Sequence, residues 1–308
     1  REPRRFTWWG HRLAQRVWAE SPRLSEGFEV CRVHAETDLV RNVPARKEVP
    51  GLLAALNRFA SLSALVWHPE QRRLTLRCGV YVHPQNLSWL SRLFLAAVGL
   101  QAADAHIKAP ELARLLGGEP DTSPHPHTGW RPRADEMLGV IEQVFAPQGR
   151  GPSPFTDADF KAALQLAPRS WVLATGNGAG LTAELPFFDD VPAVLGGRGT
   201  ALLVATATER HPQLGSGALL RLSLPALPGA DPADSRRGAQ LAGELNRAEP
   251  QAWAAAHFLG AWTFDPTLGL TFVTFLPAAV YRARLLDAML RSMAARAQWA
   301  RSYLRAGR

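Results

Sequence analysis

The sequence contains little cysteine and no long apolar run. Its only cysteines are Cys31 and Cys78, which excludes the disulfide framework of a small secreted protein. Both lie in runs that resemble strands, so we expect buried free thiols. No stretch of 18 or more apolar residues occurs, and the basic start is not followed by a signal-peptide core. These absences predict a protein of the reducing cytoplasm with no membrane span.

Lysine is also scarce, with three residues in the whole chain. Arginine therefore carries nearly all of the positive charge, and the formal net charge is +8. Abundant arginine, alanine, glycine and proline are typical of a GC-rich coding sequence, so this charge favours an acidic partner only weakly. The chain has 308 residues, 46% hydrophobic and 20% charged, which suffices for two domains with cores.

An internal repeat is visible. Leu-Asn-Arg occurs at residues 56–58 and again at 245–247. In both places an apolar run follows, then an X-Pro turn (His68-Pro69 or Asp265-Pro266), then a Leu-Thr strand start and a helix. The shared order predicts two diverged copies of one small unit.

Turn residues and apolar periodicity predict the elements of each copy. Strand pairs are expected at 28–33 with 37–43, 171–175 with 181–185, 200–208 with 218–224, and 259–264 with 270–275. Helices are expected at 54–57, from 86, at 134–145, from a cap at Thr156 to about 168, at 239–247 and at 279–304. Residues 8–18 fit either a strand or a helix. Hairpins alternating with helices indicate an α+β fold with antiparallel sheets.

The second half resembles the fold of type III secretion chaperones and YbjN-like proteins (TY-Chap type). The resemblance rests on Leu245-Asn-Arg247, Leu259-Gly-Ala-Trp262, residues 270–277 and the terminal helix, and it covers 155–304 better than 6–103. It implies two repeats of a small antiparallel sheet packed against helices, in a pseudo-dimer, and polypeptide binding in place of catalysis. The expected divisions are a degenerate first repeat (1–115), a linker with a helix near 134–145 (116–154) and a second repeat (155–308).

Motifs that suggest chemistry have simpler structural interpretations. Gly176-x-Gly178-x-Gly180 precedes a predicted strand, whereas a dinucleotide loop precedes a helix. Ser216 lies between two strands, unlike a nucleophile elbow. His125-Pro-His127 has no further ligand at metal spacing, and Asp189-Asp190 is interpreted as a loop. The sequence therefore predicts no catalytic residue, cofactor or metal.

Two sets of residues are candidates for binding. The apolar set lies on the predicted hairpin near the junction of the two copies, where a groove for a partner is expected: Trp262, Phe264, Phe272 and Phe275. The cationic set lies on or beside the terminal helix and could bind anions: Arg282, Arg284, Arg291, Arg296 and Arg301.

The leading hypothesis is a non-enzymatic protein that binds another polypeptide, as a chaperone or adaptor does, by strand addition or in an apolar groove. It acts as a monomer with pseudo-dimeric repeats or as a homodimer. The first alternative is nucleic-acid binding through the basic termini, where tryptophans accompany arginines. The second is an enzyme or ligand sensor whose site is assembled in space from residues such as His211, Glu184 and Asp265.

Overall fold

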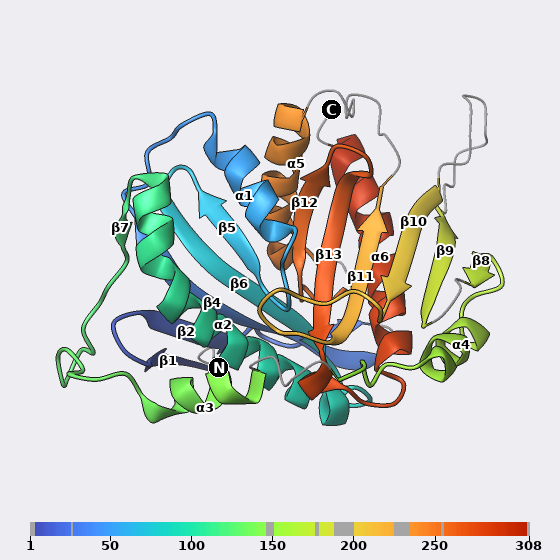
Figure 1. The fold of residues 1–308 in the computed structure, drawn as a ribbon, viewed down its shortest axis with the longest axis horizontal. Helices are drawn as coiled ribbons and strands as arrows, with labels where there is room; N and C mark the ends of the chain where they lie inside the picture. The colour runs from blue at the N-terminus through green and yellow to red at the C-terminus, as the bar shows by residue number, and fades with distance from the viewer. Residues whose placement is uncertain are drawn as a thin grey trace.

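The structure is a computed structural model that describes residues 4–25, 27–145, 151–175, 179–187, 200–224, 235–253 and 256–306. Within these ranges the protein is mixed α+β, with two antiparallel sheets and six α-helices. Figure 1 shows the two sheets beside each other, with the N-terminal half on the left and the C-terminal half on the right.

The first sheet has the strand order β1-β2-β4-β6-β5, and β3 and β7 both pair with β4. Its strands are β1 (Arg5–Trp9), β2 (Ala14–Ala19), β3 (Arg23–Ser25), β4 (Phe28–Arg41), β5 (Ala64–His68), β6 (Arg73–Val82) and β7 (Glu119–Pro120). Its helices are α1 (Val49–Asn57) and the long α2 (Leu87–Leu116), and α3 (Glu136–Phe145) lies along α2 (Figure 1).

The second sheet has the strand order β12-β13-β11-β10-β9-β8. Its strands are β8 (Val172–Thr175), β9 (Gly180–Pro186), β10 (Thr200–Thr206), β11 (Gly217–Ser223), β12 (Ala261–Asp265) and β13 (Gly269–Pro277). The accompanying helices are α4 (Asp157–Gln165), α5 (Ser235–Ala248), the short η1 (Glu249–Gln251) and η2 (Ala278–Val280), and α6 (Leu285–Ala306).

Local chemistry accounts for several element boundaries. The β12–β13 turn is closed by Asp265, whose carboxylate accepts the backbone N–H groups of Thr267 and Leu268 at 2.8 and 3.1 Å. At the end of that turn Gly269 has φ +75°, which favours glycine. Helix α4 begins after the cap predicted at Thr156, and the structure adds a capping box between Thr156 and Asp159.

One prediction for the first half differs from the structure, and one open alternative is decided. Residues 28–33 and 37–43 were expected to form a hairpin, but β4 runs unbroken from Phe28 to Arg41. No glycine, proline or asparagine interrupts that run, and a bulge between Asp38 and Val40 absorbs the irregularity. Residues 8–18 contain an antiparallel strand pair, β1 and β2, and no helix.

The two halves meet where the edge strands β5 and β12 approach helices α1 and α5. We call this region, formed by β5, β12, α1 and α5, the seam. Figure 1 shows α1 and α5 side by side between the two sheets, and each helix contacts the edge strand of the other half. Helix α5 lies close to β12 because Gly238 has no side chain, and a Cβ there would overlap the Phe264 ring. One hydrophobic cluster contains buried residues from both halves.

Candidate functional site

The recurring Leu-Asn-Arg tripeptide has a structural role at the seam. The Asn57 side chain donates to the carbonyl oxygen of Leu65 at 3.0 Å and accepts from its N–H at 2.9 Å. Asn246 binds the backbone of Trp262 in the same two ways, at 2.8 Å each. Each asparagine therefore fixes a helix to the edge strand of its own half.

The adjacent arginines join the halves to each other. Arg58 donates to the carbonyl oxygen of Phe264 on β12 at 3.0 Å. In the reverse direction, Arg247 donates to the carbonyl oxygen of Trp67 on β5 at 3.2 Å. The two contacts are reciprocal. The repeated tripeptide was visible in the sequence, but its role in joining the halves is seen only in the structure.

A cavity of about 290 Å³ lies at the seam, and we call it the seam cavity. Each helix supplies one stripe with the spacing i, i+3, i+4, i+7. The stripes and the remaining lining residues are Pro50, Leu53, Ala54 and Asn57 of α1, Ala239, Ala242, Gly243 and Asn246 of α5, and Leu65, Trp67, Pro69, Gln240, Glu244, Arg247 and Trp262. Most of the α5 stripe is small (Ala239, Ala242 and Gly243), which leaves space beside α1.

The seam cavity is mainly apolar and opens to solvent. Leu65, Trp67 and Pro69 are only half-buried there. Charged groups of the lining are limited to Glu244 and Arg247, which are also half-buried. The cavity therefore offers apolar contact in its interior and polar groups for orientation, which is the usual composition of a binding pocket.

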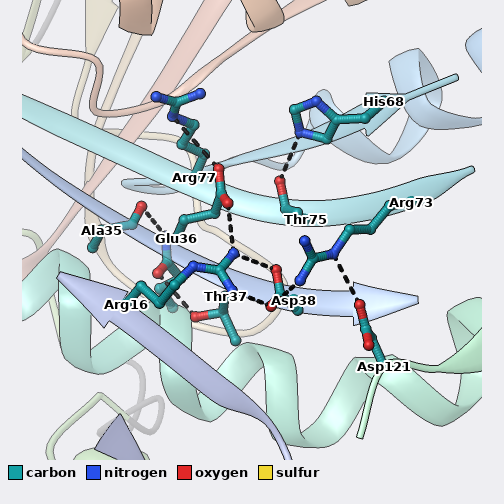
Figure 2. Close-up of polar contacts among 11 residues, drawn as sticks. Arg16, Ala35, Glu36, Thr37, Asp38, His68, Arg73, Thr75, Arg77 and Asp121 are labelled. Atoms are coloured by element: carbon teal, nitrogen blue, oxygen red, sulfur yellow. Dashed lines mark hydrogen bonds and ion pairs between the residues drawn. The ribbon is translucent and has the colours of Figure 1, made fainter. Parts of the chain in front are cut away.

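A polar cluster lies apart from the seam cavity, on β2, β4 and β6 of the first sheet (Figure 2). Arg16 binds Glu36 at 2.8 Å and Asp38 at 2.7 Å, and Arg73 binds both Asp38 and Asp121. Arg77 lies 3.8 Å from Glu36. Burial raises the pKa of Asp38, although Arg16 and Arg73 act to lower it. Because these carboxylates are paired with guanidinium groups, the cluster is suited to holding the strands together.

His68 borders this cluster (Figure 2). Its Nε2 atom lies 3.3 Å from the Thr75 hydroxyl (Figure 2). Burial lowers the pKa of His68. The neighbouring arginines also lower this pKa, whereas Glu36 raises it. His68 is therefore neutral at pH 7, and its contact joins two neighbouring strands.

The apolar residues predicted to contact a partner belong to the core. Trp262, Phe264, Phe272 and Phe275 are between 0% and 4% exposed. The Trp262 indole N–H donates to the buried Glu249 carboxylate at 2.6 Å, and its ring packs edge-on against Phe272. These side chains cannot form an exposed groove, although Trp262 borders the seam cavity from within.

The predicted cationic surface is reduced by burial. Arg296 is fully buried, where it binds Glu249 at 2.7 Å and lies over the Phe272 ring. Arg301 is 7% exposed and lies over Phe187. Arg284 pairs with Asp287 at 3.0 Å, whereas Arg282 and Arg291 are exposed. Two of the five arginines are therefore excluded from an anion-binding surface.

The proposed distributed site of His211, Glu184 and Asp265 does not assemble through direct contacts. The His211 Nδ1 atom accepts two N–H groups of its own turn, and its Nε2 atom contacts the carbonyl oxygen of Phe59 at 2.9 Å. Asp265 closes the β12–β13 turn. In the described part of the chain, no hydrogen bond or ion pair links any two of the three.

The other sequence motifs have structural placements. Strands β8 and β9 pair antiparallel as predicted, while residues 176–178 between them and Asp189-Asp190 lie outside the described residues. His125 Nδ1 accepts N–H groups of its own turn, as His211 does. The described residues contain no group of three or more metal-ligating side chains. Among the described helices, none combines the length and apolar character needed to cross a membrane.

Comparison with known protein families, curated proteins and solved structures finds no match to this chain.

Proposed function

We propose that this protein binds other polypeptides without catalysing a reaction, as a chaperone or adaptor does. The seam cavity is the observation that carries the proposal. It receives one or two bulky apolar side chains of the partner between the stripes of α1 and α5. Its volume of about 290 Å³ suits side chains of that size.

The shape of the seam favours a polypeptide over a compact small molecule. Two helices border the cavity over two turns each, which is the arrangement in which grooves bind apolar anchors of a peptide. Gln240, Glu244 and Arg247 are half-buried in its lining and can bind the polar backbone of that peptide.

We also propose that the two halves are diverged copies arranged as a pseudo-dimer, as the likeness to secretion chaperones and YbjN-like proteins implies. The reciprocal bonds of Arg58 and Arg247 support this arrangement. So does the strand order, since β5-β6-β4-β2-β1 corresponds to β12-β13-β11-β10-β9.

Both cysteines are free thiols, which fits the cytoplasm.

The test fills the cavity by the substitution Gly243→Leu. A Cβ atom at Gly243 would meet no heavy atom closer than Arg247 Nη1 at 3.8 Å, so the helix tolerates the change. The control is Gly139→Leu in α3, where a Cβ meets nothing within 4 Å. Both variants are compared with the original protein for binding of peptides selected from a random displayed library.

We expect selected peptides rich in leucine, phenylalanine and tryptophan, bound roughly 10- to 100-fold more weakly by Gly243→Leu, which corresponds to the burial of one apolar side chain. Gly139→Leu should bind them normally. If no peptide is selected, or if Gly243→Leu binds selected peptides with unchanged affinity while folded, the seam cavity is not a polypeptide site.

A further inference from the structure

A second cavity, away from the seam, lies beside the turn between β1 and β2. It has a volume of about 340 Å³ and is lined by Arg12, Thr122, Trp130 and Arg131. We call it the tryptophan recess. Arg12 comes from the turn between β1 and β2, and the other residues follow β7 in the sequence.

The walls of the tryptophan recess are fixed by hydrogen bonds. The Ser123 N–H donates to the carbonyl oxygen of Arg12 at 2.8 Å, and Leu13 forms a β-bridge with Thr122. The Trp9 indole N–H reaches the Ser123 hydroxyl at 3.2 Å. The wall formed by the backbone of Arg12 and Thr122 is therefore preformed, which lowers the entropic cost of ordering it around a ligand.

The recess is cationic. Arg12 is exposed, and its guanidinium group makes no hydrogen bond or ion pair with the residues that the structure describes. The acidic groups near Thr122 and Arg131 in the sequence have other partners, since Asp121 binds Arg73 and Asp135 binds Arg131, both within 3 Å. Arg12 therefore presents an unneutralised charge at the cavity.

The recess also contains an exposed aromatic surface. Trp130 is 55% exposed, although burying an indole ring is strongly favourable in water. A planar ring stacked on Trp130 would remove that surface from water. Arg12 lines the same cavity as Trp130, so a planar ring that carries an anion matches both features.

We propose that the tryptophan recess binds a nucleobase that carries a phosphate group. The base stacks on Trp130, and Arg12 pairs with the phosphate. This chemistry is shared by a free mononucleotide and by one nucleotide of a single-stranded nucleic acid. An acidic peptide supplies the anion without the planar ring, so the exposed tryptophan favours the nucleotide.

The test measures the binding of two ligands. Fluorescence anisotropy follows a fluorescein-labelled single-stranded oligothymidylate at several salt concentrations, and calorimetry follows thymidine monophosphate. The variants are Trp130→Ala, Trp130→Phe and Arg12→Ala. The matched control is Arg291→Ala, which removes an arginine that is also exposed, from α6.

Trp130→Ala should weaken binding roughly 5- to 100-fold, the value of one stacked base, and Trp130→Phe should restore most of it. Arg12→Ala should weaken binding and reduce the slope of log affinity against log salt by about 0.7, as for one lost phosphate contact to a single strand. Arg291→Ala and Gly243→Leu should bind as the original protein does.

Comparable binding of both ligands identifies the mononucleotide as sufficient, and binding of the oligonucleotide alone identifies the single strand. The proposal is overturned if neither ligand binds, if Arg291→Ala weakens binding as much as Arg12→Ala, or if polyglutamate displaces the oligonucleotide at equal charge concentration. Since Gly243→Leu leaves the recess intact, failure here is distinguishable from failure of polypeptide binding at the seam.

Discussion

At the scale of single residues, Arg296 shows how a cation is held in the core. Its guanidinium group binds Glu249 at 2.7 Å, donates to the carbonyl oxygen of His257 and lies 3.6 Å from the centre of the Phe272 ring. Glu249 also accepts the indole N–H of Trp262. The pair links α6, η1 and β12 in one hydrogen-bonded group.

Removing one member of this buried pair should be costly. Arg296→Met leaves the Glu249 carboxylate in the core without its counterion, so we expect the free energy of unfolding to fall by about 3–5 kcal/mol. Urea denaturation measures the loss. The control Arg291→Met changes an exposed arginine of the same helix. It should change the free energy of unfolding by less than about 0.5 kcal/mol, as surface substitutions usually do. Equal stability of the two variants would contradict the assigned role of Arg296.

Two buried histidines should make stability depend on pH. Burial lowers the pKa of His34 to about 4 and that of His257 to about 3, from about 6.5 in the unfolded chain. The unfolded state binds protons more readily, so this stability is fully present above pH 6.5 and is lost as the pH falls towards 4. Each histidine contributes a slope of up to about 1.4 kcal/mol per pH unit in that window.

The substitution His257→Asn tests this origin, because the Nδ1 atom of His257 accepts the N–H of Tyr81 and must stay unprotonated to do so. Urea denaturation at pH 7, 6, 5 and 4 should show a shallower loss of stability in the variant than in the original protein. Parallel curves would mean that His257 does not titrate on unfolding.

The sequence revealed much of the residue-scale chemistry, but not the burial of arginine. The Thr156 cap and the Asp265 turn were predicted because both depend on neighbours within three residues. Arg296 could have been suspected from its place beside Met293 and Ala297 on the buried stripe of α6. Its partner Glu249 is 47 residues distant, so no local pattern predicts the pair.

At the scale of elements, the asparagines of the seam hold helices to strands. Asn246→Ala leaves the N–H and the carbonyl oxygen of Trp262 unpaired in a buried site. We expect a loss of roughly 2–4 kcal/mol in the free energy of unfolding, as for two unsatisfied groups. Asn57→Ala, whose bonds are only partly buried, should lose less by the same denaturation assay. A smaller effect for Asn246→Ala would contradict this ranking.

Element prediction succeeded where turn chemistry was local. The pairs β8–β9, β10–β11 and β12–β13 were all expected, and α6 was expected with a start six residues too early. The predicted break in β4 was wrong because residues 34–36 contain no turn residue, and the strand continues through them. A groove was expected at the junction of the two copies, but the α1 and α5 stripes that line the seam cavity were not identified, since these helices lie far apart in the sequence.

At the scale of the whole molecule, the two halves should unfold together. Val66 and Cys78 of the first half share one hydrophobic cluster with Leu245 and Leu259 of the second. The bonds from Arg58 to Phe264 and from Arg247 to Trp67 cross between halves over separations of 206 and 180 residues. Separating the halves would expose this shared core, so an intermediate with one half folded is unfavourable.

Hydrogen exchange in increasing urea, resolved to peptides by mass spectrometry, tests this cooperativity. Peptides from β6 in the first half and α6 in the second should lose protection at the same midpoint. The variant Asn246→Ala alters only a contact within the second half, yet it should lower both midpoints equally because the shared cluster couples them. If only the α6 peptides shift, the halves are separate folding units, and the seam is then an interface between two domains that can open.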